Sequence, residues 1–413
     1  MVHTKKPRLS PKHFSLLLTN AIIYFDSVLY CYLVPILAPL FFPNQTGMLQ
    51  MICGYSVLAT SCLAKPLGVL FFSHMAQHKK EGLTLRMTLL GVSIGLLAIS
   101  CLPTGQTGWK YGALGLLVAR MIMDASAAGE HAIAKLYLIE NASTRWAKKL
   151  STWYEMSSMV GIILAGAVGS LFASANHWRP YWRLPFILAG ILTLLLIFLR
   201  MGNCCTTPDT PTKVLFSTRE IMLHLWKERR AIIRIAIVTG FSYVTYSIPF
   251  VFMNSFVPLV TNLSYASMMQ QNTPLMIMDL CLLSVLGKVL PKYNHNNIMA
   301  LASGLIVVSI IPLFIGLQGA SMVYITLLRC WLFVLGVIFC SSLTVWCKEQ
   351  VAPHNSYLTI GLATVLGGSL LGKSAPAICL ALFYGSNDLL FPALYIAVLA
   401  FMATLVMANS TSE

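Results

Sequence analysis

Residues 181–200 have the sequence YWRLPFILAGILTLLLIFLR, in which only Arg183 and Arg200 carry charge. A helix of about 20 apolar residues is long enough to span the roughly 30 Å hydrocarbon core of a bilayer. Runs of this kind recur along almost the whole chain and are separated by short connectors. The sequence therefore predicts an all-α membrane protein that crosses the bilayer many times.

The composition supports this interpretation. Of the 413 residues, 57% are hydrophobic and 10% are charged, too few charges to cover the surface of a soluble protein of this length. The net charge of +15 is explained by basic connectors that face anionic lipid headgroups. We therefore expect the lipid bilayer as a partner, and no nucleic acid.

The apolar runs predict twelve transmembrane helices in two six-helix bundles. A polar connector near the middle of the chain separates six runs from six, so we expect an N-terminal bundle over 1–200, a cytoplasmic linker over 201–230 and a C-terminal bundle over 231–413. The predicted spans are 14–42, 49–72, 84–103, 112–139, 152–176, 181–200, 231–258, 268–290, 297–316, 320–347, 356–384 and 387–408.

Basic residues predict the orientation. Cytoplasmic connectors of membrane proteins carry an excess of Lys and Arg. Such residues precede the first span, follow the second and fourth spans and fill the 201–230 connector, whereas 43–48, 261–267, 317–319 and 385–386 have none. Lys110, Arg179 and Arg183 are exceptions to the alternation. We expect both termini to be cytoplasmic and the first run to be a retained helix, since it is too long for a signal peptide.

Several chemical classes are excluded by missing motifs. The chain has no His-Glu-x-x-His, no Gly-x-Ser-x-Gly and no Gly-x-x-x-x-Gly-Lys-Ser/Thr, so an enzyme or an ATP-driven pump is not expected. Most of the eleven cysteines lie inside apolar runs without Cys-x-x-Cys spacing, which favours packing over metal binding or disulfides. We expect no metal and no cofactor.

Function is expected from ionisable residues at membrane depth. A charge at the centre of a span costs about 2.5–3.5 kcal/mol even on insertion scales, so such residues are retained for ion pairs or for transport. Structural ion pairing is the alternative for each one. The candidates are Asp26, Lys65, Arg120, Asp124, Glu130, His131, Lys135, Glu155, Asp279, Arg329 and Lys373.

The fourth predicted span is the richest in these candidates. At 100° per residue, Arg120, Asp124, His131 and Lys135 fall on one face, which must meet a partner helix or water rather than lipid. Arg120 and Asp124, four residues apart, are able to pair along the helix. Glu130 lies on a different face of this helix and points toward a different neighbouring helix. His131 is either a titrating group or a hydrogen-bonded packing residue.

Six short motifs then occur in the order seen in one family of transporters. They are Tyr24-Phe25-Asp26 with Leu29-Tyr30, Leu37-Ala38-Pro39-Leu40-Phe41-Phe42-Pro43, Lys65-Pro66-Leu67-Gly68, Arg120-Met121, Gly129-Glu130 and Trp182-Arg183-Leu184-Pro185-Phe186. In these residues the chain resembles the metabolite:proton symporter family of the major facilitator superfamily. The resemblance covers 14–200 well and the second half only in its topology.

This resemblance implies a multi-pass protein of the bacterial inner membrane that works as a monomer by alternating access. Its relatives import zwitterions such as proline and betaine, or carboxylates such as citrate and oxoglutarate, together with a proton. Carried onto this chain, it makes Asp26, Arg120, Glu130 and Glu155 candidates for substrate binding and coupling. The intramembrane set adds Lys65, Asp124, His131 and Arg329 to this predicted site. The proton gradient would be the energy source.

One departure from the family keeps alternatives open. The loop after the second helix of such proteins carries an Asp followed by basic residues, but here 74–81 reads HMAQHKKE, and 287–292 has no acid. A solute exchanger or uniporter of the same fold, and a degenerate non-transporting receptor, therefore remain alternatives to a proton-coupled symporter. Balanced intramembrane charge fits a zwitterion or a carboxylate and does not choose between them.

Overall fold

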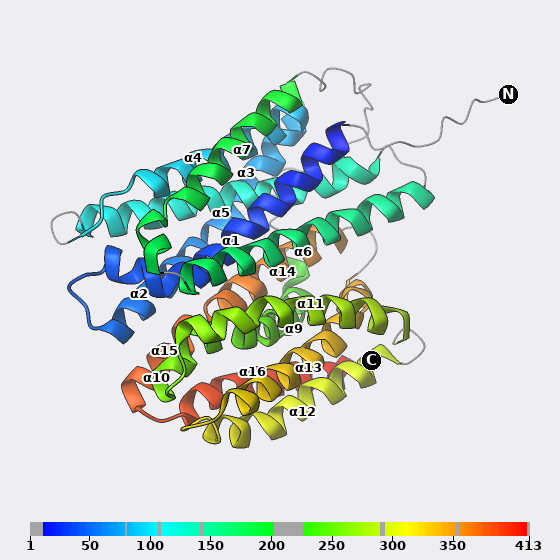
Figure 1. The fold of residues 1–413 in the computed structure, drawn as a ribbon. Helices are drawn as coiled ribbons and strands as arrows, with labels where there is room; N and C mark the ends of the chain where they lie inside the picture. The colour runs from blue at the N-terminus through cyan, green and yellow to red at the C-terminus, as the bar shows by residue number, and fades with distance from the viewer. Residues whose placement is uncertain are drawn as a thin grey trace.

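A computed structural model describes residues 11–78, 81–105, 109–140, 144–174, 176–201, 226–289, 294–351 and 356–410. Throughout this part of the chain the regular structure is helical (Figure 1). In chain order the helices are α1 (Pro11–Phe41), α2 (Gly47–Ser61), α3 (Ala64–His78), α4 (Glu81–Cys101), α5 (Trp109–Glu140), α6 (Thr144–Ser174), η1 (Asn176–Tyr181), α7 (Leu184–Met201), α9 (Arg229–Ser247), η2 (Ile248–Phe252), α10 (Met253–Val260), α11 (Tyr265–Val289), α12 (His295–Ile315), α13 (Met322–Glu349), α14 (Ser356–Gly367), η5 (Gly368–Lys373), α15 (Ala375–Ser386) and α16 (Leu390–Ser410).

These elements combine into the twelve predicted membrane crossings. Three crossings are interrupted: α2 with α3, α9 with η2 and α10, and α14 with η5 and α15. Eleven crossings in the described chain are long and apolar enough to span a bilayer by their composition. The remaining crossing, α11, is more polar because it carries Gln270, Gln271, Asn272 and Asp279. The prediction of a twelve-helix membrane fold is confirmed, with α11 as a continuous crossing that is more polar than the others.

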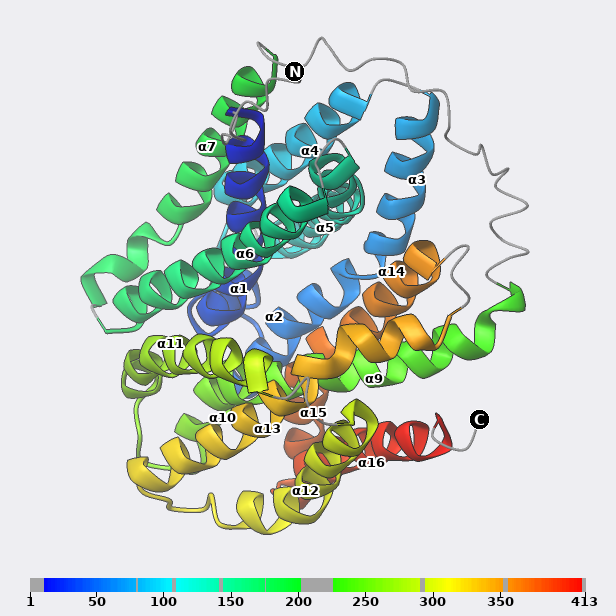
Figure 2. The ribbon, with the colours of Figure 1, turned by 90° about the vertical axis from the view of Figure 1, so that its right-hand side faces the viewer.

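The helices form two groups. Helices α1 to α7 pack mainly on one another, as do α9 to α16, and Figures 1 and 2 show the two groups as separate blocks of ribbon. Contacts between the groups come from α6 with α11, α2 with α15 and η5, and α3 with α14. Most of the connector predicted over 201–230 lies outside the described residues.

A close helix approach occurs at matching places in the two groups. Gly161 of α6 packs so tightly on α1 that an added Cβ would lie 2.1 Å from the carbonyl oxygen of Ala21. In the other group, Gly367 of α14 meets α9, where an added Cβ would lie 2.1 Å from the carbonyl oxygen of Ala236. Small residues allow membrane helices to approach at this distance, because lipid gives no hydrophobic drive for association. This match relates α1 to α9 and α6 to α14.

Two short π-helical segments break the second group. Segment η2 lies between α9 and α10, and η5 lies between α14 and α15. Single-turn π-segments inside α-helices are frequent at functional sites, because they shift the register of the side chains that follow. Segment η5 ends at Lys373, one of the predicted intramembrane charges.

Candidate functional site

The centre of the first group holds a buried ion pair between α1 and α5. Arg120 Nη1 donates to Asp26 Oδ2 at 2.8 Å, and both side chains are almost completely buried. The Arg120 guanidinium also lies over the ring of Tyr30, 4.0 Å from its centroid. Asp26 Oδ1 and two guanidinium nitrogens, Nε and Nη2, have no hydrogen-bond partner. The pair therefore keeps capacity for a further donor and acceptor.

The predicted pairing of Arg120 with Asp124 along the same helix is not the one observed. Because α1 packs against α5, Asp26 reaches Arg120 from the side, and Asp124 turns to α2 and α3 instead. There Asp124 accepts a hydrogen bond from Ser61 Oγ at 2.6 Å and lies 3.6 Å from Lys65 Nζ. Interhelical partners therefore replace the local pair.

A lysine from the second group reaches this cluster. Lys373 Nζ, at the end of η5, donates to Ser27 Oγ of α1 at 2.7 Å. Ser27 follows Asp26 directly, so Lys373 lies beside the Asp26–Arg120 pair. The positive charges of Lys373 and Lys65 repel each other, and the negative charge of Asp124 attracts both. Lys373 is also an electrostatic neighbour of Asp26, so two lysines and Arg120 share two aspartates, Asp26 and Asp124.

Arg329 occupies a separate buried position between α13, α11 and α1. Its guanidinium donates to the side-chain oxygen of Asn272 and, at 3.4 Å, to the carbonyl oxygen of Met268. Tyr32 of α1 is an electrostatic neighbour of this group. No ion pair of Arg329 is found among the described residues, although its side chain is fully buried.

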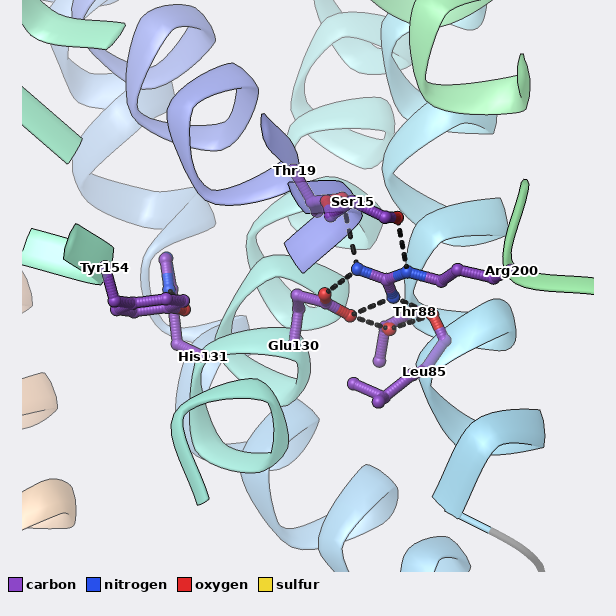
Figure 3. Close-up of polar contacts among 8 residues, drawn as sticks. All are labelled: Ser15, Thr19, Leu85, Thr88, Glu130, His131, Tyr154 and Arg200. Atoms are coloured by element: carbon purple, nitrogen blue, oxygen red, sulfur yellow. Dashed lines mark hydrogen bonds and ion pairs between the residues drawn. The ribbon is translucent and has the colours of Figure 1, made fainter. Parts of the chain in front are cut away.

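Glu130 lies apart from Asp26 in a network of its own (Figure 3). Arg200 Nη2 donates to Glu130 Oε1 at 2.7 Å, and Thr88 Oγ1 donates to Glu130 Oε2 at 2.6 Å. The same guanidinium binds Ser15 and Thr19 of α1 through their hydroxyl oxygens and the Leu85 carbonyl oxygen of α4. Helices α1, α4, α5 and α7 are therefore joined through one charge pair.

The remaining predicted residues lie nearby but outside these pairs. His131 Nδ1 is 3.1 Å from the hydroxyl oxygen of Tyr154, and its ring packs on that of Tyr24 with centroids 5.3 Å apart. Figure 3 shows His131 and Tyr154 beside the Glu130 network. Glu155 is exposed at the surface of α6. The side chain of Lys135 lies outside the described residues.

Sequence reasoning missed Arg200, Asn272 and Ser27. Arg200 is in the last turn of an apolar helix, a position that usually places an arginine head group in the interface. The available signal was a set of hydroxyl residues at spacing four, Ser15 with Thr19 and Thr84 with Thr88, on otherwise apolar runs. Within each pair the two residues lie on one helix face, and Ser15, Thr19 and Thr88 bond to Arg200 or Glu130.

Comparison with known proteins agrees with this architecture. The family model described as Major Facilitator Superfamily matches residues 16–376. A proline/betaine transporter of Escherichia coli (strain K12) is 25% identical over 93% of this chain and 79% of the relative. An alpha-ketoglutarate permease of the same strain is 23% identical over 88% of this chain and 85% of the relative.

Solved structures share the fold at low identity. The crystal structure of a D-xylose-proton symporter superposes with a TM-score of 0.78 at 13% identity and covers 96% of each chain. A POT family transporter superposes with a TM-score of 0.74 at 12% identity, covering 98% of each chain. The relatives are membrane transporters and not enzymes, as the sequence predicted. Together with the family match over most of its length, this shows that the chain is a multi-pass membrane protein of the Major Facilitator Superfamily.

Proposed function

We propose that this protein is a proton-coupled symporter that carries a small zwitterionic or carboxylate metabolite by alternating access. We further propose that it lies in the bacterial inner membrane with both termini in the cytoplasm and works as a monomer. The transporter relatives support transport of a small molecule. The observation that carries proton coupling is the buried Asp26–Arg120 pair.

The chemistry of this pair suits a proton carrier. A buried carboxylate must be paired or protonated, because an isolated charge in an apolar interior is strongly disfavoured. Asp26 has one oxygen that is bonded to Arg120 and one that has no partner. A proton on the carboxyl would release Arg120, whose free nitrogens would then be available to a substrate. Proton binding and substrate binding would thus be linked at one residue pair.

Contacts between the two helix groups supply the parts that must open and close. Tyr55 of α2 and Ser255 of α10 share a hydrogen bond of 2.6 Å across the groups. Tyr265 of α11 donates to the backbone carbonyl oxygen of Tyr32, and Gln270 donates to Ser174 Oγ at 3.2 Å. These bonds lie in the half of the molecule away from the chain termini. Alternating access would break them when that side opens.

The test is uptake into proteoliposomes with imposed gradients. Native protein should accumulate its substrate when an inward proton gradient is imposed, and a protonophore should abolish accumulation. Asp26→Asn should retain exchange of substrate across the membrane but lose accumulation against a gradient. Accumulation that follows sodium would refute proton coupling. Exchange without any accumulation by the native protein would instead identify an exchanger of the same fold.

A further inference from the structure

We infer that the substrate is a dicarboxylate anion, one carboxylate of which binds Arg329. This inference rests on the proposed transport function and deepens it, because the sequence left zwitterions and carboxylates as equal alternatives. The observations that carry it are the missing counter-ion of Arg329, a set of unpaired donors around it and the arrangement of Lys65 and Lys373.

Arg329 is a buried cation without an acid. Its relative exposure is 0%, and its electrostatic neighbours are Tyr32 and Cys330. The candidate intramembrane acids of the described chain lie elsewhere: Asp26 pairs with Arg120, Asp124 lies by Lys65, Glu130 pairs with Arg200, and Glu155 neighbours Tyr24 and Tyr154. Asp279 follows Asn272 by seven residues on α11, about 10 Å along the helix, and is an electrostatic neighbour of Tyr246 and Cys340 but not of Arg329.

The relation between the two helix groups shows which position lacks an acid. In the first group, Asp26 follows the close-approach residue Ala21 by five positions and pairs with Arg120. In the second group, the residue five positions after Ala236 is Phe241, which packs edge-on against Phe339 with centroids 5.0 Å apart. The second group therefore has no acid at the position that matches Asp26, and the phenyl ring there contacts α13 ten residues after Arg329.

Several hydrogen-bond donors near Arg329 also have no partner. They are Arg329 Nε, the side-chain nitrogen of Asn272 and the hydroxyl of Tyr246, all of them buried atoms. Asn272 and Tyr246 both lie close to the Tyr32 hydroxyl, which is an electrostatic neighbour of Arg329. Unpaired buried donors are costly unless a ligand satisfies them. A carboxylate accepts several hydrogen bonds and fits the planar fork of an arginine.

The second carboxylate would be held by the lysines. Lys65 and Lys373 come from opposite helix groups and repel each other; both neighbour Asp124, and Lys373 also neighbours Asp26. Lys373 binds Ser27, and Arg329 neighbours Tyr32, so the α1 residues next to these two cations are five positions apart, about 7.5 Å along the helix axis and about 140° around it. An anion with a carboxylate at each end is able to reach both. A zwitterion that bound in the same way would instead place its positively charged group beside one of these cationic side chains, which would repel it.

Binding to the purified protein in detergent tests this inference without any gradient. The probes are succinate and alpha-ketoglutarate as dicarboxylates, and proline and glycine betaine as zwitterions. A ligand that binds the folded state raises the Tm. We expect a saturable rise with a dicarboxylate and none with either zwitterion. A rise with a zwitterion alone, or no rise with either dicarboxylate, would overturn the inference and leave transport itself to be judged by uptake.

Variants separate binding from folding. Arg329→Gln should lower the affinity for the dicarboxylate by at least about tenfold, the loss expected for a charge-assisted hydrogen bond. The Tm without ligand should stay equal or rise. Lys373→Gln, at a half-buried position, should weaken it as well. The control is Lys348→Gln, an exposed lysine on the same helix as Arg329, which should bind like the native protein. If Arg329→Gln does not fold, native affinity in both Arg329→Lys and Lys373→Gln refutes the assignment.

Discussion

Glu130 and Arg200 meet at 2.7 Å between Oε1 and Nη2, and both side chains are buried in the space where α1, α4, α5 and α7 converge. Every oxygen of the carboxylate has a donor, and the guanidinium also binds Ser15, Thr19 and Leu85. A carboxylate satisfied in this way differs from Asp26, which retains an oxygen without a partner. The difference favours a stabilising role for Glu130 and a coupling role for Asp26.

The first prediction concerns this pair. Arg200→Gln should lower the free energy of unfolding by about 3–5 kcal/mol, because it leaves Glu130 as an uncompensated buried charge. Glu130→Gln should be damaging for the same reason, and the double variant should lose less than the sum of the two. The measurement is thermal or denaturant unfolding of purified protein in detergent. Unaltered stability of Glu130→Gln together with lost accumulation would show instead that Glu130 couples the proton.

The second prediction concerns Arg120. Arg120→Ala should abolish uptake, because it removes the partner of Asp26 and two buried guanidinium nitrogens that have no other hydrogen-bond partner. Arg120→Lys should leave uptake strongly reduced, since an ammonium keeps the charge but not the planar fork. Uptake is measured in proteoliposomes at equal amounts of incorporated protein. If both variants transport at the native rate, the pair has only a structural role.

The third prediction concerns the matching glycines. Gly161→Ala and Gly367→Ala should each destabilise the protein, because the new Cβ would lie 2.1 Å from a backbone oxygen, and overpacking costs about 1–3 kcal/mol. Gly304→Ala is the control, since an added Cβ there meets nothing within 4 Å. This control should be neutral or slightly stabilising. Equal Tm values for all three variants would contradict the close approach of the helices.

The fourth prediction concerns the hydrogen bond between the groups. Replacing Tyr55 with Phe and Ser255 with Ala removes both hydroxyls, so no unpaired group stays buried. The side away from the termini should then open more often. Distances between spin labels at Asn44 and Asn262, in the connectors on that side, should shift to longer values. A native distance distribution in the double variant would show that this bond does not hold the two groups together.

The fifth prediction concerns topology. Reporters fused at Asn44 and at Asn262 should lie on the side of the membrane away from the cytoplasm, and reporters at the two termini should lie in the cytoplasm, because the connectors around Asn44 and Asn262 have no Lys or Arg. A protease-protection or alkaline-phosphatase assay reads the location of each fusion. A cytoplasmic signal at Asn44 would reverse the proposed orientation.

The sequence alone determined the number of crossings, the membrane class and the superfamily. These depend on hydrophobic length and on short local motifs, which are properties of contiguous residues. It also identified Asp26, Arg120 and Glu130 as residues with a reason to be buried, since charge at membrane depth is rare and costly. None of these conclusions requires knowledge of which helices touch.

The tertiary structure alone decided which charges pair. Local spacing favoured Arg120 with Asp124, but helix packing brought Asp26 to Arg120 and left Asp124 to Lys65 and Ser61. Arg200 could be recognised as the partner of Glu130 only in the structure, where α7 lies against α1, α4 and α5. An ion pair between helices depends on the rotation and the separation of both, and these are set by contacts far apart in the chain, such as Gly161 against Ala21. For the same reason the missing counter-ion of Arg329 becomes visible only when the helices are assembled.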